Sequence, residues 1–269
     1  TQGGSYEVKV TITNPADDST TVSTTIDVED PDEHAWAASY CYANGSNPDW
    51  SGCPAGATRV ANQSSLNSAL AGRMRANSRH LFRRGDSFAR SPDGHAADGP
   101  VHIGAFGIGA RPRMNFSVSG NSTMIQLRSD WRVSGLDFRG SGGGVPAGQP
   151  GDSSYTVRNA LAWDLDAEGV WSCIDFWNQA SNHASGLAFV DFACRPTVNT
   201  GGAGRLIWHR SKATIYQGLD IDASASTIPP MRTVLMQTTV FQHSRLEGSS
   251  YGGIFGGDLC VVTTNGEAW

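Results

Sequence analysis

The stretch Val133-Ser134-Gly135-Leu136-Asp137-Phe138-Arg139-Gly140 decides the fold, because its pattern recurs along the second half of the chain. The recurrences are residues 161–167 (LAWDLDA), 189–193 (FVDFA), 217–223 (QGLDIDA) and 242–248 (QHSRLEG). Superposed, they give an apolar column with steps of 27, 27, 29 and 25 residues: Phe138, Leu165, Phe192, Ile221 and Leu246. Apolar and polar positions that alternate with a period of this length are typical of a solenoid, in which each coil packs only on its neighbours.

The fold class follows from this repeat. A second column lies two positions earlier and comprises Leu136, Trp163, Val190, Leu219 and Ser244. A strand-only unit of this length suits three short strands per coil, so the sequence predicts an all-β fold, a right-handed parallel β-helix with apolar columns inside. Within residues 64–74, Leu66, Leu70 and Met74 recur at helical spacing, which predicts an amphipathic helix that caps the open end of the solenoid.

The first thirty residues have a different character. Residues 6–13 alternate polar and apolar side chains and residues 20–28 are rich in β-branched residues, so two strands are predicted, joined by a turn into a hairpin. Residues 4–13 and 24–28 resemble the last two strands of a PKD domain, an immunoglobulin-like β-sandwich of secreted bacterial and archaeal proteins. The alternative is a hairpin that docks on the main domain.

A second resemblance follows an acidic linker at residues 29–33. Residues 53–58 (CPAGAT), the expected helix and residues 80–88 (HLFRRGDSF) are similar to the entry of secreted right-handed parallel β-helix proteins of the pectate-lyase-like superfamily. In such proteins a PKD domain often lies upstream, and the superfamily includes polysaccharide lyases, glycoside hydrolases, tailspikes and adhesins. The resemblance therefore implies a secreted or cell-surface bacterial protein. The expected parts, cut from a longer protein at both ends, are a PKD-like strand pair (1–30), a linker with disulfide loop and capping helix (31–79) and the β-helix (80–269).

Composition narrows the range of partners. The 269 residues carry a net charge of −5, and 17% of them are charged. A net negative chain with scattered arginines argues against a nucleic-acid binder. No apolar run approaches the ~20 residues that span a bilayer, so no membrane span is predicted. Strand edges at the solenoid ends or on the hairpin are candidate sites of self-association.

The cysteines fit an exported protein. Cys41 and Cys53 bracket a short loop rich in Gly, Pro and Asn, and Cys173 and Cys194 are separated by nearly one coil. Both pairs are predicted to form disulfides, which persist in oxidising compartments, and Cys260 is left over.

An aspartate column is the most informative polar feature. It comprises Asp137, Asp164, Asp191 and Asp220, with Asp166 and Asp222 beside it. Strands of one sheet lie about 4.8 Å apart, so stacked carboxylates repel one another and need compensation. Four explanations are open. The charges are compensated either by calcium, held by Asp137, Asp164, Asp166 and Asp222, or by Arg139 and Arg245. Alternatively, Asp191 and Asp220 act as catalytic acid and base, or the column is a solvated face whose aspartates favour tight turns.

A basic and aromatic cluster at residues 208–212 offers the parts of a lyase. The candidate substrate-binding residues are Trp208 as a sugar platform, His209, His243 and Arg245, and the candidate bases or clamps for a uronate carboxylate are Arg210 and Lys212. The alternative is that this cluster packs at a corner of the solenoid. The Asn-Thr-Asp, Gly-His-Gly and Arg-Ile-Lys patterns of polygalacturonases are absent, as is the short motif of alginate-lyase-like members.

Two functional hypotheses follow. The leading one is binding and cleavage of an extracellular acidic polysaccharide, by a lyase or a hydrolase, along an outer groove of the solenoid. The alternative is a non-catalytic surface adhesin, matrix or filament component. An enzyme is expected to concentrate titratable groups beside a groove, whereas a scaffold spreads them evenly. The aspartate column extends over four coils, which favours the scaffold.

Overall fold

The chain divides into two units, Thr1–Ala37 and Ala38–Trp269. The structure, a computed structural model, describes residues 4–13, 18–28, 34–90, 97–117, 123–141, 144–148, 157–176, 184–196, 207–222, 232–247 and 261–263. Residues 38–79, predicted as part of a linker, disulfide loop and cap, thus belong to the same unit as the solenoid. In the described part of the chain, no helix is long and apolar enough to cross a membrane.

The first unit contains the predicted hairpin. Strands β1 (Gly4–Thr13) and β2 (Ser19–Val28) pair antiparallel, from Gly4 opposite Val28 to Thr13 opposite Ser19. The β-branched residues of β2 suit an extended backbone, which is why propensity located this strand. The PKD assignment stays a prediction.

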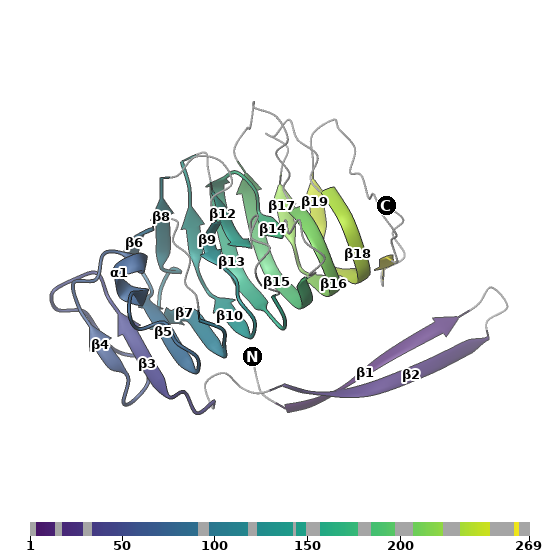
Figure 1. Cartoon of the computed structure of the whole chain (residues 1–269), viewed down its shortest axis with the longest axis horizontal. Coiled ribbons are helices and arrows are strands. Elements are labelled where there is room, and N and C mark those ends of the chain that lie inside the picture. Colours follow the sequence, from purple (N-terminus) through teal and green to yellow (C-terminus); the bar gives the residue numbers. More distant parts are fainter. Residues whose placement is uncertain are drawn as a thin grey trace. The chain divides into compact units, whose positions relative to one another are not determined.

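The second unit is a parallel β-helix, as predicted. Its described strands are β3 (Ala38–Tyr42), β4 (Thr58–Val60), β5 (Ser78–Arg83), β6 (Ser87–Arg90), β7 (Val101–Phe106), β8 (Arg113–Phe116), β9 (Thr123–Gln126), β10 (Trp131–Ser134), β11 (Asp137–Arg139), β12 (Val145–Gly148), β13 (Leu161–Val170), β14 (Ile174–Phe176), β15 (Ala184–Pro196), β16 (Ile207–Gln217), β17 (Asp220–Asp222), β18 (Arg232–Gln242), β19 (Arg245–Glu247) and β20 (Val261–Thr263). Within this unit, strands of later coils lie beside those of earlier coils in sequence order (Figure 1). The right-handed sense stays a prediction, which the general handedness of parallel crossovers supports.

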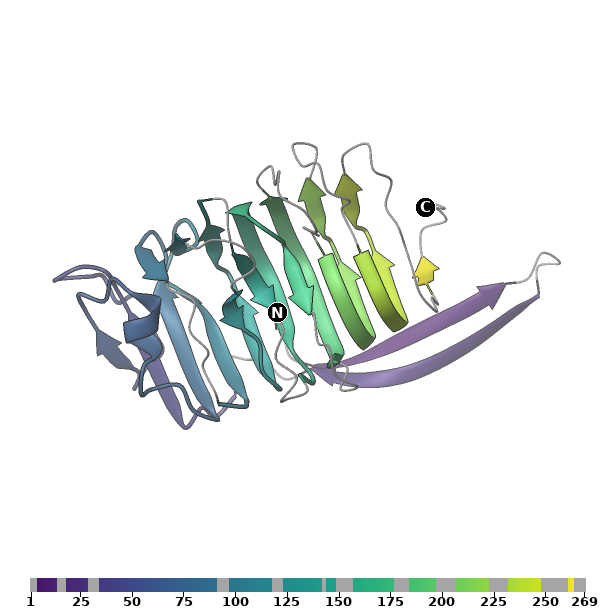
Figure 2. The same ribbon diagram turned by 45° about the horizontal axis from the view of Figure 1, so that its top comes forward.

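The strands form three parallel ladders, one for each strand of a coil. The first ladder runs through β3, β5, β7, β10 and on through β13, β15, β16, β18 and β20. The second joins β6, β8 and β11 to the second half of β13, the end of β15, then β17 and β19. The third joins β9, β12 and β14 to the first parts of β16 and β18. In Figure 2 the turned view brings strands of different ladders into sight.

The corner between the first and second ladders corrects the predicted repeat. One residue per coil has a positive φ there: Gly135 (63°), Asp164 (54°), Asp191 (49°), Gly218 (62°) and His243 (49°). Aspartate and histidine tolerate this left-handed conformation better than most residues do, so they replace glycine. The predicted superposition aligned the corner residues Asp164 and Asp191 with strand residues such as Asp137. In these two coils it is therefore shifted by two residues from the register of the structure. The in-register polar column is instead Arg113, Asp137, Asp166, Ala193, Asp220 and Arg245.

Most of the predicted core positions whose burial is described are buried, and they belong to two inward columns. One contains Leu136, Leu165, Phe192 and Leu219, the other contains Phe138, Ala167, Cys194 and Ile221, and each residue is at most 1% exposed. Trp163 and Val190, predicted to point inward, are only half-buried and lie on the outer face. The side chain of Leu246 lies outside the described set. Full burial of a phenylalanine such as Phe138 contributes about 1.5–3 kcal/mol.

A short helix lies near the start of the solenoid. α1 (Leu66–Leu70) begins after Ser65, whose side chain accepts a hydrogen bond from the backbone N–H of Ser68. Leu66 and Leu70 are buried in the main core, where Met74 packs from outside the helix. The helix is shorter than the predicted residues 64–74, because Ala71 leaves the helical region with a ψ of 123° and Gly72 follows with a φ of +68°.

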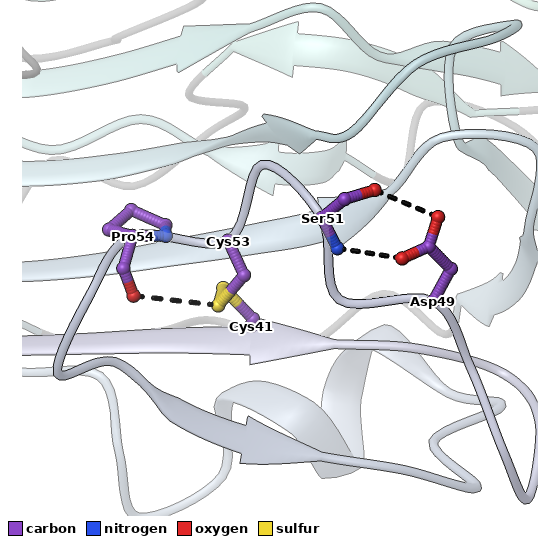
Figure 3. Close-up of a disulfide and its surroundings, with 5 residues drawn as sticks. All are labelled: Cys41, Asp49, Ser51, Cys53 and Pro54. Atoms are coloured by element: carbon purple, nitrogen blue, oxygen red, sulfur yellow. Dashed lines mark hydrogen bonds between the residues drawn. A yellow bond between two sulfur atoms is a disulfide. The ribbon is translucent and has the colours of Figure 1, made fainter.

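Both predicted disulfides are present. Cys41–Cys53 closes a loop on the outer face of β3, and Cys173–Cys194 links neighbouring coils. Inside the first loop, the backbone and hydroxyl of Ser51 both donate to the Asp49 carboxylate, at 2.9 and 2.8 Å (Figure 3). These hydrogen bonds lower the pKa of Asp49. Cys260 lies outside the described residues.

Candidate functional site

An open groove of about 720 Å³ lies along the second ladder, near the start of the solenoid. Its lining holds equal numbers of arginines and aspartates together with small residues: Arg84, Arg111, Arg113, Arg139, Asp86, Asp137, Asp164, Asp166, Gly85, Ser87, Gly109 and Ala110. No side chain in this lining is aromatic or aliphatic beyond alanine. The groove therefore suits a polar ligand.

Two insertions at the first corner build one side of the groove. Ile103 is paired with Val133 of the next coil, and Arg113 is paired with Asp137. Between these paired positions the chain advances by ten residues in the earlier coil and by four residues in the later one. The extra residues form a loop that contains Gly109 and Arg111. The preceding coil has a similar loop, and the two are joined by hydrogen bonds from Gly85 N–H to the Ala110 carbonyl (2.9 Å) and from Arg113 N–H to the Asp86 carbonyl (2.8 Å).

The other side is made by regular strands and the corner residue Asp164. Asp137 of β11 and Asp166 of β13 are partners in the parallel register, so their backbones lie at strand spacing, about 4.8 Å. Asp164 precedes Asp166 by two residues, and its side chain is 41% exposed, against 12% for Asp137 and 25% for Asp166. Three carboxylates thus converge on this side, and Asp164 is the most accessible of them.

Arginines link these carboxylates across the coils. Arg111 pairs with Asp164 and lies 3.9 Å from Asp166. Arg139 lies 2.7 Å from Asp137 and 3.7 Å from Asp166, and it also pairs with Glu168. The hydrogen bond to Asp164 raises the pKa of the Arg111 guanidinium. The stacked aspartates are therefore compensated by arginine, which was one of the four alternatives left by the sequence.

The ladder continues beyond the groove. Arg195 approaches Asp166 at 3.8 Å and Asp220 at 3.4 Å, and Arg245 approaches Asp220 at 3.1 Å. From Asp166 to Arg245, acidic and basic side chains therefore alternate from one coil to the next, whereas Asp137 and Asp166 are like-charged neighbours. This arrangement replaces the predicted run of like charges.

The calcium site predicted from the sequence stays a prediction, and arginines contact the carboxylates assigned to it. Asp137, Asp164 and Asp166 each contact a guanidinium, which occupies oxygens that a calcium ion needs. Across the residues whose placement is described, no group of three or more His, Cys, Asp or Glu side chains has a geometry that could hold a metal. Asp222 follows two residues after Asp220 on β17, away from the groove.

The predicted catalytic residues are not gathered in the groove. Asp191 is a corner residue and Asp220 pairs with arginines two coils beyond Asp166. The backbones of Trp208 and His209 pair with Asp175 and Phe176 of β14, on the third ladder rather than the second. The side chains of Trp208, His209, Arg210 and Lys212 lie outside the described set. Exposed His243 takes the same corner as Asp191, and Arg245 follows on β19.

Sequence reasoning missed the arginines of the inserted loops. Arg84 lies in the HLFRRGDSF stretch used for the family resemblance, but nothing there indicated a groove. Arg111 follows the Gly-Ile-Gly turn at residues 107–109, where two glycines have positive φ. Insertions break the repeat, so these residues had no aligned positions in other coils from which a site could be recognised.

Comparisons with known proteins bear on the fold. No protein-family model matches the chain, and no curated protein matches it significantly. The native crystal structure of the GH136 lacto-N-biosidase from Eubacterium ramulus is similar, with 11% identity and a TM-score of 0.50 over 78% of this chain and 52% of that one. The selenomethionine derivative of the same enzyme gives a TM-score of 0.42 over the same shares. This chain spans about half the length of that enzyme, and at this identity the likeness supports the parallel β-helix fold alone.

Proposed function

We propose that this protein binds an acidic polysaccharide outside the cell and cleaves it in the groove of the second ladder. The observation that carries the proposal is the concentration of Asp137, Asp164 and Asp166 in an open groove of about 720 Å³. The structural neighbour is a glycoside hydrolase with the same kind of fold, and fold alone does not fix function. Disulfides are compatible with export.

The carboxylates favour hydrolysis over elimination. Glycosidases use two carboxyl groups about 5–5.5 Å apart when they retain configuration and ~6.5–9.5 Å apart when they invert it. Asp137 and Asp166 are neighbours at strand spacing, with Asp164 at the adjacent corner. The lyase candidates Arg210 and Lys212 are absent from the groove lining, so a lyase reaction would need one of the groove arginines as its base.

The arginines in and around the groove lining support an acidic ligand. Asp86 is neutralised by Arg83, and Asp166 receives Arg195, although neither arginine lines the groove. Arg111, Arg113 and Arg139 therefore share aspartates that are partly compensated from outside, whereas Arg84 contacts no carboxylate among the described residues. The lining as a whole is balanced, with four arginines and four aspartates, so the attraction of an anionic glycan rests on Arg84, the lining arginine that contacts no carboxylate among the described residues.

The test is a screen of acidic and neutral polysaccharides with two readouts, new reducing ends and absorbance near 235 nm from unsaturated products. We expect new ends without absorbance, and at least a hundredfold lower rate in Asp164→Asn. Asp130→Asn is the matched control, because Asp130 is also an aspartate with positive φ (58°) but lies outside the groove. Absence of cleavage on every glycan, or equal loss in both variants, contradicts the proposal.

A non-catalytic adhesin or filament component is the second candidate. It is favoured by the alternating charges of Asp166, Arg195, Asp220 and Arg245, which link coils well beyond the groove. Repetition of this kind stabilises a scaffold without chemistry. Glycan binding that is unaffected by Asp164→Asn, without cleavage, supports this candidate, and ordered assemblies in electron micrographs support a filament.

A further inference from the structure

Arg84 differs from the other arginines of the groove lining. Arg111, Arg113 and Arg139 each contact an aspartate. Among the described residues, Arg84 has no carboxylate within ion-pair distance, and its Nη1 donates a single long hydrogen bond of 3.4 Å to the Gly109 carbonyl. A guanidinium has five N–H donors, so this contact leaves Arg84 both charge and donors for a ligand.

The backbone holds Arg84 firmly in the wall of the groove. Its N–H donates to the carbonyl of Phe106 at 3.0 Å, and the N–H of Gly85 donates to the carbonyl of Ala110 at 2.9 Å. The neighbouring carboxylate of Asp86 is already engaged, by Arg83 and by the N–H of Asn44 at 2.8 Å. Asp86 is 8% exposed, although it contributes to the groove lining.

The corner opposite Arg84 has no side chain. A Cβ atom built on Gly135 lies 3.3 Å from Nη2 of Arg84 and 3.6 Å from Oδ2 of Asp164. The same corner carries an aspartate in the next two coils, Asp164 and Asp191. Gly135 thus keeps this corner free of a side chain, so that the guanidinium of Arg84 and the most accessible groove carboxylate both approach it; a Cβ atom there would press on Arg84.

We propose that Arg84 and the open corner at Gly135 form a subsite for the carboxylate of a uronic acid residue, an inference that rests on the proposed function. Arginine binds a planar carboxylate with two parallel hydrogen bonds, which fixes orientation as well as charge. Asp164 then faces the same sugar ring from the other side of the Gly135 opening. With this subsite, tight binding requires a carboxylate at one defined position of the ligand, rather than negative charge anywhere along the groove.

The experiment measures calorimetric binding of uronic acid oligosaccharides, each as the free acid and as its methyl ester. The ester keeps the sugar and removes only the charge. We expect the wild-type protein to bind one free acid at least tenfold more tightly than its ester, and Arg84→Gln to reduce this ratio to about one. Arg158→Gln is the matched control, because Arg158 is an exposed arginine outside the groove.

A second variant fills the opening without disturbing the backbone. Gly135→Asn places a side chain that tolerates positive φ, as Asp164 and Asp191 do at the equivalent corner. We expect it to weaken binding of the free acid at least tenfold while the thermal melting temperature stays within a few degrees. Unchanged binding in Gly135→Asn overturns the subsite.

The possible outcomes separate this inference from the proposed function. Equal binding of acid and ester, an unchanged ratio in Arg84→Gln, preference for sulfated oligosaccharides, or no binding of any uronate overturns the subsite, even if a neutral glycan is cleaved. Acid-selective binding that depends on Arg84, without cleavage of any glycan, supports the subsite and removes the catalytic part of the proposed function.

Discussion

Replacing Arg139 by glutamine tests whether arginine compensates the stacked carboxylates. Arg139 lies between Asp137 and Asp166 and also pairs with Glu168. Its side chain is 27% exposed, and those of Asp137 and Asp166 are 12% and 25% exposed, so water screens this cluster only in part. Glutamine keeps most of the length and removes the charge that lies between the two in-register carboxylates, which then retain only Arg113 near Asp137 and Arg111 and Arg195 near Asp166.

The expected loss follows from the strand spacing. Two like charges about 4.8 Å apart repel by roughly 1 kcal/mol in water and by about 3 kcal/mol at an effective dielectric constant of 20. Because the groups are partly buried, we expect Arg139→Gln to lower the free energy of unfolding by about 2 kcal/mol. Arg158→Gln, at an exposed site outside the cluster, is expected to change it by less than about 0.5 kcal/mol.

Urea unfolding followed by circular dichroism measures both values. The double variant Arg139→Gln/Asp166→Asn removes one of the two repelling charges and is expected to regain part of the loss. Calcium is expected to stabilise Arg139→Gln more than the wild-type protein, since it can then replace the lost positive charge between the two carboxylates. The reasoning is refuted if Arg139→Gln and Arg158→Gln unfold at the same midpoint, or if the double variant is less stable than the single one.

Three other predictions concern the framework. Replacing Cys41 and Cys53 by serine removes the disulfide that joins two residues 12 positions apart. We expect the free energy of unfolding, measured by chemical denaturation, to fall by about 3 kcal/mol. An unchanged midpoint would show that the loop is not constrained in this way. Asp191→Gly is expected to be tolerated, because glycine takes this corner in other coils, whereas Asp191→Val is expected to cost about 1–2 kcal/mol more in denaturation; equal stability of the two variants contradicts the assigned corner. The melting temperature of the wild-type protein is expected to be the same with EDTA and with calcium, and a clear stabilisation by calcium would restore the metal hypothesis.

The repeat made the fold class predictable. Phe138 and Ile221 mark inward positions because burial in a narrow core demands apolar side chains at alternate residues. The spacing of Cys173 and Cys194 indicated a disulfide between neighbouring coils, because residues that are almost one period apart in the sequence come close together when the coils stack. These features depend on local alternation and on a regular period, both of which a sequence displays directly.

The groove was not predictable in this way. An Asp in a strand and an Asp at a left-handed corner have the same letter, so Asp137 and Asp164 were placed in one column although they occupy different positions. Arg84 and Arg111 lie in inserted loops without equivalents in later coils. The repeat therefore gave no signal for them.

The sequence by itself determined a parallel β-helix with two disulfides and a polar aspartate-rich face. Only the tertiary structure decided which charges meet, because the register between coils depends on a corner conformation that shifts neighbouring side chains by two residues. That shift brings Asp166 rather than Asp164 beside β11, where it meets Arg139 of the neighbouring coil, and Arg84 lies beside the corner of Gly135. The contacts that define the candidate site are long-range, and their geometry is fixed only when the coils stack.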